Sequence, residues 1–396
     1  MLWILLFSFE VKAYTFSEAI RAVADHQEIK IIEQKVRSLN QESKIKGSWG
    51  DPKLKLAAKN FPKDSLKDDE TPMTGIEVGL SQKISLTNRY GDLKNSVKAM
   101  AEAKEYDKQQ IKRSLYLSLW QLAIEKKRII KDEKLTKENL DWISKMLSVS
   151  QKLYSNGTIG QQALLEIKIR KSELESLIDE LKLERSEVNR RLAYIYSKKA
   201  QNLDISSVPW SYLNKEHLKS LDPKELRFKK GIESKEYLIK AHKKSLLSDV
   251  TFSLAYTKRS DIDNRGDFIT ASISFPLPFS DEKHSKIESA VIQKDVAYRQ
   301  MQNYKGQRSR DIQVLDTRIS KINNTLKKLK EKTIAFAKSS RDISAKSYQV
   351  GKTSYLELLN AELKLQNLLM KKNLLEAKLQ NNLVHKKYVR GDSLYE

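Results

Sequence analysis

The sequence of 396 residues contains only 12 glycines and 7 prolines, so turns are scarce and the regular elements must be long. Charged residues make up 32% and hydrophobic residues 39%, a balance that favours long amphipathic helices over a thick globular core. The chain has no cysteine, which excludes disulfides and thiolate metal sites, and no apolar run reaches the roughly 18 residues of a membrane-spanning helix. Any membrane-crossing part must therefore consist of β-strands in a closed barrel.

The formal net charge of +23 raises the alternative of a nucleic-acid-binding protein. However, acidic residues are interspersed with the 74 lysines and arginines along the whole chain, as in the segment KKLKEK at 327–332. This pattern is typical of solvated helix faces, and no compact basic module with interleaved aromatic residues stands out. We therefore expect no nucleic-acid partner.

The N-terminus has the pattern of a secretory signal peptide. An apolar run, Leu2 to Phe9, is followed by Val11-Lys12-Ala13, which carries small residues where a signal peptidase reads the chain. This predicts a signal peptide at 1–13 and a mature protein that begins at Tyr14, although no cationic residue precedes the run. A buried N-terminal strand or helix is the alternative.

The first half of the chain begins with a short helical stretch and then alternates apolar and polar residues in two segments, 53–60 and 76–87. About ten residues with one apolar and one polar face are typical of strands in a membrane barrel that encloses water. On this reading Val78 and Leu80 face lipid. A half-buried sheet of a soluble protein would show the same alternation.

A long helix is predicted after the first strand pair, because 88–154 contains no proline and a single glycine, Gly91. Apolar residues beyond it recur in steps of three and four, the spacing of coiled-coil packing. The motif Tyr154-Ser-Asn-Gly157 interrupts the helices and predicts a tight turn near 157. These elements form a first structural repeat, 14–202, which is followed by a linker at 203–231 where Pro209, Trp210 and Pro223 interrupt the helical pattern.

The second half, 232–396, repeats the same plan. Alternating segments at 250–258 and 268–279 predict a second strand pair, and Tyr348-Gln-Val-Gly351 predicts a second turn, with Gly351 placed 194 residues after Gly157. The expected helical seam before this turn continues through Phe336, Ile343 and Val350. The residues expected to face lipid here are Phe252, Leu254, Ile273 and Phe275.

Four strands cannot close a barrel by themselves, since about eight is the smallest closed number. Unpaired strand edges in lipid are prohibitively costly, so other copies of the chain must complete the barrel.

The order of these elements resembles the TolC-type outer-membrane efflux protein family over about residues 14–390. The two Tyr-x-x-Gly turns, each followed by a Leu-Leu pair, and the strand exits Ser81-Gln-Lys-Ile-Ser-Leu and Ser274-Phe-Pro-Leu-Pro-Phe carry the resemblance. Lys83 departs from the family's exit pattern. The resemblance implies a mixed α and β membrane protein: a homotrimer whose twelve-stranded β-barrel lies in outer-membrane lipid, above a periplasmic tunnel of antiparallel coiled-coil helices.

The resemblance also implies a passive exit duct of a tripartite efflux or type I secretion system. Such a duct receives solutes from an inner-membrane transporter through a periplasmic adaptor, or membrane fusion protein. Adaptor contacts would then fall at the helix turns, at Tyr154, Gly157, Tyr348 and Gly351.

The resemblance further implies that the linker at 203–231 is equatorial. It also implies that Glu357 and Asn360, six and nine positions after the second glycine, line the periplasmic entrance together with Tyr348. The alternative is that Glu357 is one more solvated helix residue. Threefold symmetry would turn Glu357 into an acidic ring that selects cations. Ala163 stands where the family places an acidic residue, so a Tyr–carboxylate latch is not expected.

The sequence offers no site for catalysis. The five histidines are scattered, and no phosphate-binding loop or nucleophile motif occurs, so we expect no cofactor, no metal and no enzyme. The alternative function is an exported or cytosolic coiled-coil scaffold without a pore. Its weakness is that a scaffold has no use for four lipid-compatible strands.

Overall fold

The computed structural model describes residues 14–196, 202–215, 221–260, 266–277 and 279–395. The predicted signal peptide at 1–13 lies outside these residues, as do five residues of the predicted linker, 216–220, and Pro278.

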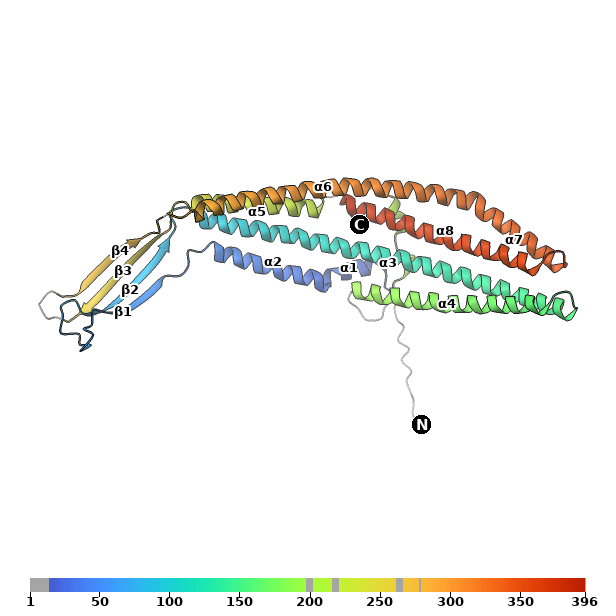
Figure 1. The fold of residues 1–396 in the computed structure, drawn as a ribbon, viewed down its shortest axis with the longest axis horizontal. Coiled ribbons are helices and arrows are strands. Elements are labelled where there is room, and N and C mark those ends of the chain that lie inside the picture. Colours follow the sequence, from blue (N-terminus) through green and yellow to red (C-terminus); the bar gives the residue numbers. More distant parts are fainter. Residues whose placement is uncertain (1–13, 197–201, 216–220, 261–265, 278, 396) are drawn as a thin grey trace, which may run out of the picture. The chain divides into compact units, whose positions relative to one another are not determined.

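The described residues form long helices and four strands (Figure 1), which confirms the predicted mixed fold class. Along the first half the elements are α1 (Phe16–Ala22), a short 3-10 turn η1 (Val23–Asp25), α2 (Gln27–Lys46), β1 (Lys53–Lys59), β2 (Gly75–Ile84), α3 (Arg89–Ser155) and α4 (Gln161–Ile195). Two 3-10 turns follow, η2 (Ile205–Ser207) and η3 (Trp210–Asn214). The second half contains α5 (Pro223–Lys244), β3 (Val250–Arg259), β4 (Phe268–Ser274), α6 (Glu282–Lys328), a π-helical turn η4 (Leu329–Thr333), α7 (Ile334–Gln349) and α8 (Tyr355–Arg390).

The predicted long helix after the first strand pair is confirmed by α3, which has 67 residues and therefore a length of about 100 Å. None of the helices in the described residues combines the length and the apolar character needed to cross a membrane.

The chain divides into two compact units. The first contains Met1–Lys30, Gln109–Asp222 and Gly306–Glu396, and the second contains Ile31–Lys108 and Pro223–Lys305. Each unit collects segments from both halves of the chain, so this division differs from the two predicted repeats, 14–202 and 232–396.

The core of the first unit is centred on Trp120 of α3. Its indole is fully buried against Phe16, Trp210 and Tyr212, and its Nε1–H donates a hydrogen bond of 2.9 Å to the carbonyl oxygen of Leu394. The core thus ties the N-terminal helix, the 3-10 turns and the C-terminal tail to the middle of α3.

The predicted equatorial linker, 203–231, ends earlier than expected. Pro223 begins α5, because the fixed φ of proline and its missing N–H suit the first position of a helix. The preceding turns are part of the core, with Leu203, Val208 and Tyr212 buried.

In the second unit, the four strands form one antiparallel sheet in the order β1-β2-β3-β4. Leu54, Leu80, Leu254 and Ala271 are register partners on one face of the sheet. The register partners Lys55, Gly79, Ala255 and Thr270 lie on the other face. The alternation predicted from the sequence is therefore matched across all four strands.

The second and the fourth predicted strands, 76–87 and 268–279, extend too far. Residues 85–87 lie beyond β2, and β4 ends at Ser274, so Phe275 is not a strand residue. The reason at β4 is Pro276, which lacks an N–H for the ladder and restricts the residue before it.

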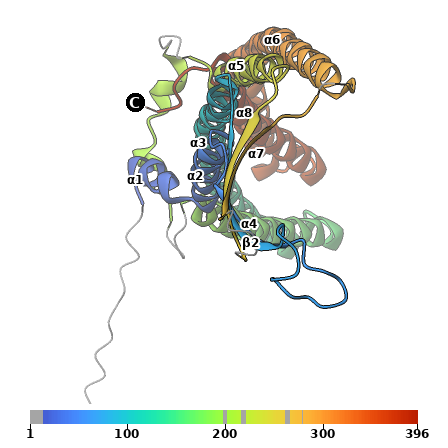
Figure 2. The same cartoon turned by 90° about the vertical axis from the view of Figure 1, so that its left-hand side faces the viewer.

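The helical seam of α7 is displaced by one residue from the predicted one. Phe336, Ile343 and Val350 are exposed, whereas Ala337, one position beyond Phe336, and Tyr348 are buried. The π-helical turn Leu329–Thr333 explains the shift, because a π turn accommodates one extra residue and so rotates everything beyond it. After the second turn, α8 returns along α7 (Figure 1 and Figure 2).

Candidate functional site

The turn between α3 and α4 is closed by a Schellman motif. Gly157 has a φ of +73° and donates its N–H to the Tyr154 carbonyl at 2.9 Å. The Thr158 N–H donates to the Leu153 carbonyl at 2.8 Å. These two bonds satisfy carbonyls that the end of a helix would otherwise leave without a donor.

The turn between α7 and α8 has the same geometry. Gly351 has a φ of +71° and donates to the Tyr348 carbonyl at 3.0 Å, and Lys352 donates to the Ser347 carbonyl at 2.9 Å. The Tyr-x-x-Gly spacing thus places a helical carbonyl and the left-handed glycine at the two ends of one hydrogen bond. The turns are also neighbours, since a Cβ at Gly351 would lie 3.9 Å from Thr158 Cγ2.

The two tyrosines of these motifs have different surroundings. Tyr154 is 43% exposed, whereas Tyr348 is 1% exposed and packs against Met146 and Leu358. The Tyr348 hydroxyl shares a hydrogen bond of 2.8 Å with the Ser150 hydroxyl of α3. Tyr348 therefore joins α7 to α3 within the protomer, and Tyr154 is the tyrosine presented at the surface.

Glu357 and Asn360 lie exposed in the first turns of α8. The Glu357 N–H donates to the Ser354 side chain at 3.3 Å, and the Glu357 carboxylate accepts a hydrogen bond from the Thr353 hydroxyl. A carboxylate in the first turn is favoured by the helix dipole. Glu357 thus supports the start of α8 while its charge remains at the surface.

A buried polar cluster behind the turns was not predicted from the sequence. Its centre is Glu362 of α8, whose carboxylate lies 3.4 Å from the guanidinium of Arg341 on α7. Arg341 also lies over the ring of Trp142, 5.6 Å from its centroid. Next to it, Arg170 of α4 donates to the side chain of Gln366. The cluster connects α4, α7 and α8.

Burial raises the pKa of Glu362 above its ordinary value, although Arg341 and Arg170 oppose the shift. Burial also raises the pKa of Tyr355, with a further contribution from the charge of Glu166. The spacing Leu358–Glu362–Leu365 was the available signal in the sequence, because steps of four and three place Glu362 on the buried stripe.

The sheet of the second unit presents two chemically different faces. Val78, Leu80, Phe252, Leu254 and Ile273, all predicted to face lipid, lie on one face and are 42% to 62% exposed. Exposed apolar residues that are contiguous over four strands indicate a surface covered by lipid or by another chain.

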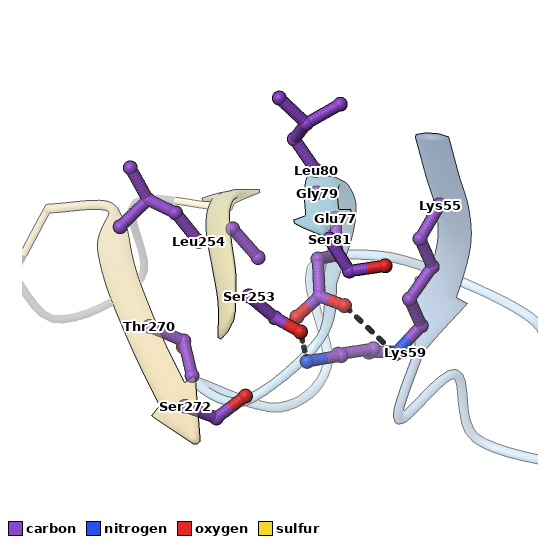
Figure 3. A pocket seen from close by; sticks show the side chains of 11 residues that line it. Lys55, Lys59, Glu77, Gly79, Leu80, Ser81, Ser253, Leu254, Thr270 and Ser272 are labelled. Atoms are coloured by element: carbon purple, nitrogen blue, oxygen red, sulfur yellow. Dashed lines mark hydrogen bonds and ion pairs between the residues drawn. The ribbon is translucent and has the colours of Figure 1, made fainter. Parts of the chain in front are cut away.

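On the opposite face, Glu77 is buried between two lysines of β1 (Figure 3). Lys55 Nζ lies 3.0 Å from the carboxylate, and Lys59 makes a second, shorter ion pair with it. Small and polar residues of β2, β3 and β4 complete a shallow pocket here, among them Gly79, Ser81, Ser253, Thr270 and Ser272.

No protein-family model matches the sequence, and no curated protein matches it either. The fold, in contrast, is similar to that of solved outer-membrane channels. The Campylobacter jejuni CmeC outer-membrane channel has a TM-score of 0.73 at 17% identity, over 99% of this chain and 92% of that one. The outer-membrane protein VceC from Vibrio cholerae has a TM-score of 0.75 at 16% identity, over 96% of each chain. The outer-membrane channel OprN has a TM-score of 0.78 at 14% identity, over 96% of this chain and 90% of that one.

These comparisons define the class of fold. Nearly the whole chain has the architecture of the outer-membrane channels, so the resemblance predicted from the sequence is confirmed at the level of the fold.

The turn glycines are expected to tolerate asparagine better than valine. Gly351→Val should weaken the turn by about 1–2 kcal/mol, because a left-handed backbone strains a β-branched residue while asparagine adopts it more readily. Space is not the cause, since the nearest atom to a Cβ at Gly351 is 3.9 Å away. Amide hydrogen exchange at 347–352 should be faster in Gly351→Val than in Gly351→Asn. Equal exchange in the two variants would contradict this account.

Glu362 is expected to make stability depend on pH. Its raised pKa means that the folded chain binds the proton more tightly, so its contribution decreases as the pH rises above the ordinary value of 4.5. The thermal midpoint of the wild type relative to Glu362→Gln should therefore be higher at about pH 5 than at about pH 8. Glu331→Gln removes an exposed carboxylate and is the control. The difference in thermal midpoint between this variant and the wild type should be the same at both pH values. If the difference for Glu362→Gln is also the same at both pH values, burial does not raise the pKa of this carboxyl.

Proposed function

We propose that the chain is one protomer of an outer-membrane exit duct that passively conducts solutes to the exterior. Three copies would pair their sheets into a twelve-stranded barrel in outer-membrane lipid, and their long helices would form a periplasmic tunnel. The single observation that carries the proposal is the exposed apolar face of the sheet, opposite a polar face suited to water.

The order of the strands supports closure of the barrel by further copies of the chain. β1 and β4 are the edge strands of the sheet, and each has a neighbour on one side only among the described strands. An edge in lipid would leave backbone N–H and C=O groups without partners, so β4 of one copy would pair with β1 of the next. The solved outer-membrane channels that share the fold support the same assignment.

We further propose that the duct works with a periplasmic adaptor and, through it, an inner-membrane transporter, in a tripartite efflux or type I secretion system. The two Schellman turns are each closed by two backbone hydrogen bonds, are neighbours and are partly exposed, as Tyr154 illustrates, which suits contact with an adaptor. The buried Tyr348 would support that surface from within. A coiled-coil scaffold without a pore is disfavoured, because it leaves the apolar sheet face without a role.

The decisive experiment on the duct itself is membrane fractionation followed by conductance measurement. The protein should appear in outer membranes as a trimer that dissociates on heating in detergent, and the trimer should open ion-conducting pores in planar bilayers. A monomer recovered in the soluble fraction, without conductance, would contradict the proposal.

The two faces of the sheet should respond oppositely to arginine. Ile273→Arg places a charge on the apolar face, at a cost of about 2–4 kcal/mol near the middle of the bilayer, repeated in each copy. Ser272→Arg, the adjacent residue of the same strand, places it on the polar face and should leave assembly intact. The amount of heat-resistant trimer on a gel measures the difference. Similar amounts in both variants would refute a lipid-facing role for the apolar face.

Glu357 and Asn360 are proposed to line the periplasmic entrance, with Glu357 forming a ring of three carboxylates. Such a ring binds multivalent cations more strongly than monovalent ones. Glu357→Ala should weaken the block of single channels by a trivalent cation added from the periplasmic side by about tenfold. Glu331→Ala removes an equal charge from the π-helical turn η4 and should leave the block unchanged. If Glu357→Ala also leaves it unchanged, Glu357 belongs to the solvated surface.

A further inference from the structure

The polar face of the sheet carries a marked excess of positive charge. By register it contains five cationic side chains and a single carboxylate, Glu77, an excess of four positive charges per protomer. The cations are Lys53, Lys55, Lys59, Lys83 and Arg259. β4 brings no charge to either face, since its sequence is FITASIS.

The excess is not neutralised inside the sheet. Glu77 is held by both Lys55 and Lys59, so one carboxylate is shared between two cations. Lys55 nevertheless remains 64% exposed, and Lys53 is exposed without an ion pair among the described residues. At the helical end of the sheet, Lys83 lies 3.1 Å from Asp249, but Arg89 lies 2.5 Å from the same carboxylate. Each carboxylate near this face is therefore outnumbered by its cationic partners.

We propose that this polar face makes the lumen of the barrel selective for anions, so that the duct favours solutes bearing carboxylate, phosphate or sulfonate groups. The inference rests on the proposed duct, in which three polar faces surround one aqueous lumen. Twelve excess positive charges would then line a wall of low dielectric, which focuses the field into the water. Rings of lysine and arginine are the arrangement by which pores select anions.

The acidic ring proposed at the entrance does not cancel this effect. Glu357 would contribute three negative charges in a trimer, against the twelve positive charges of the sheet. The entrance would govern block by multivalent cations, while the longer, charged barrel would govern which ions permeate.

The test is the reversal potential of single trimers in a planar bilayer with a KCl gradient. Cl⁻ should be favoured over K⁺ by about threefold or more when the dilute side is near 10 mM, where screening extends over about 30 Å. The preference should largely vanish near 1 M, where screening acts over about 3 Å. Pores that prefer K⁺ at low salt would overturn the inference while leaving the duct intact. Absence of pores would instead count against the proposed duct.

The variant Lys53→Glu/Lys55→Gln separates the sheet from the rest of the protein. It lowers the charge of each polar face from four to one and leaves Lys59 to pair with Glu77. Its preference for Cl⁻ over K⁺ should decrease at least twofold, because most of the excess positive charge along the wall is removed. The control is Lys258→Glu, which also replaces a strand lysine but on the apolar face, opposite Ile76 in the register. Equal shifts in the two variants would show that the polar face has no special role in permeation.

Discussion

The alternation of side chains between the two faces of each strand is the constraint on which the arrangement of the sheet depends. Because side chains alternate at every residue, pairing Leu54 with Leu80 and Leu80 with Leu254 fixes the face of each other residue in these strands. A slip of one position would bring Lys53 and Lys55 onto the apolar face and Leu54 onto the charged one. The register therefore keeps the apolar side chains on one face of the sheet and the charged and polar side chains on the other.

The long helices are constrained in a different way. Long helices that pack side by side bury only one stripe each, so most of their surface remains polar and charged. The two turns that join antiparallel helices, at Gly157 and Gly351, are closed by the same pair of backbone hydrogen bonds around a left-handed glycine. Tyr348 and Glu362 are buried next to one of these turns. They add polar contacts between neighbouring helices, and such contacts require a more specific alignment of the helices than apolar packing does.

The sequence was sufficient for features that depend on local periodicity. The alternation around Val78 and Leu254, the length of α3 and the turn glycines all follow from spacing and from backbone conformations, which neighbouring residues determine. Features that depend on tertiary contacts were not predicted from the sequence. The burial of Glu362 requires Arg341 from another helix, and the different surroundings of Tyr154 and Tyr348 cannot be read from two motifs that look alike. The end of β4 was readable in principle, since Pro276 stands directly beyond it.

The π-helical turn at Leu329–Thr333 has a consequence for comparing this chain with others. One extra residue rotates the following helix by about 100°, so that equivalent positions in a helix without the turn are offset by one from residue 334 onward. An alignment without a gap would match Phe336, which is exposed here, with residues that lie in a seam. At 14% to 17% identity the sequences themselves do not locate such a gap, whereas the buried positions Ala337 and Tyr348 do. Any substitution pattern carried over to α7 from a similar channel therefore has to be counted from the π turn, and not from Leu326, the seam residue before it.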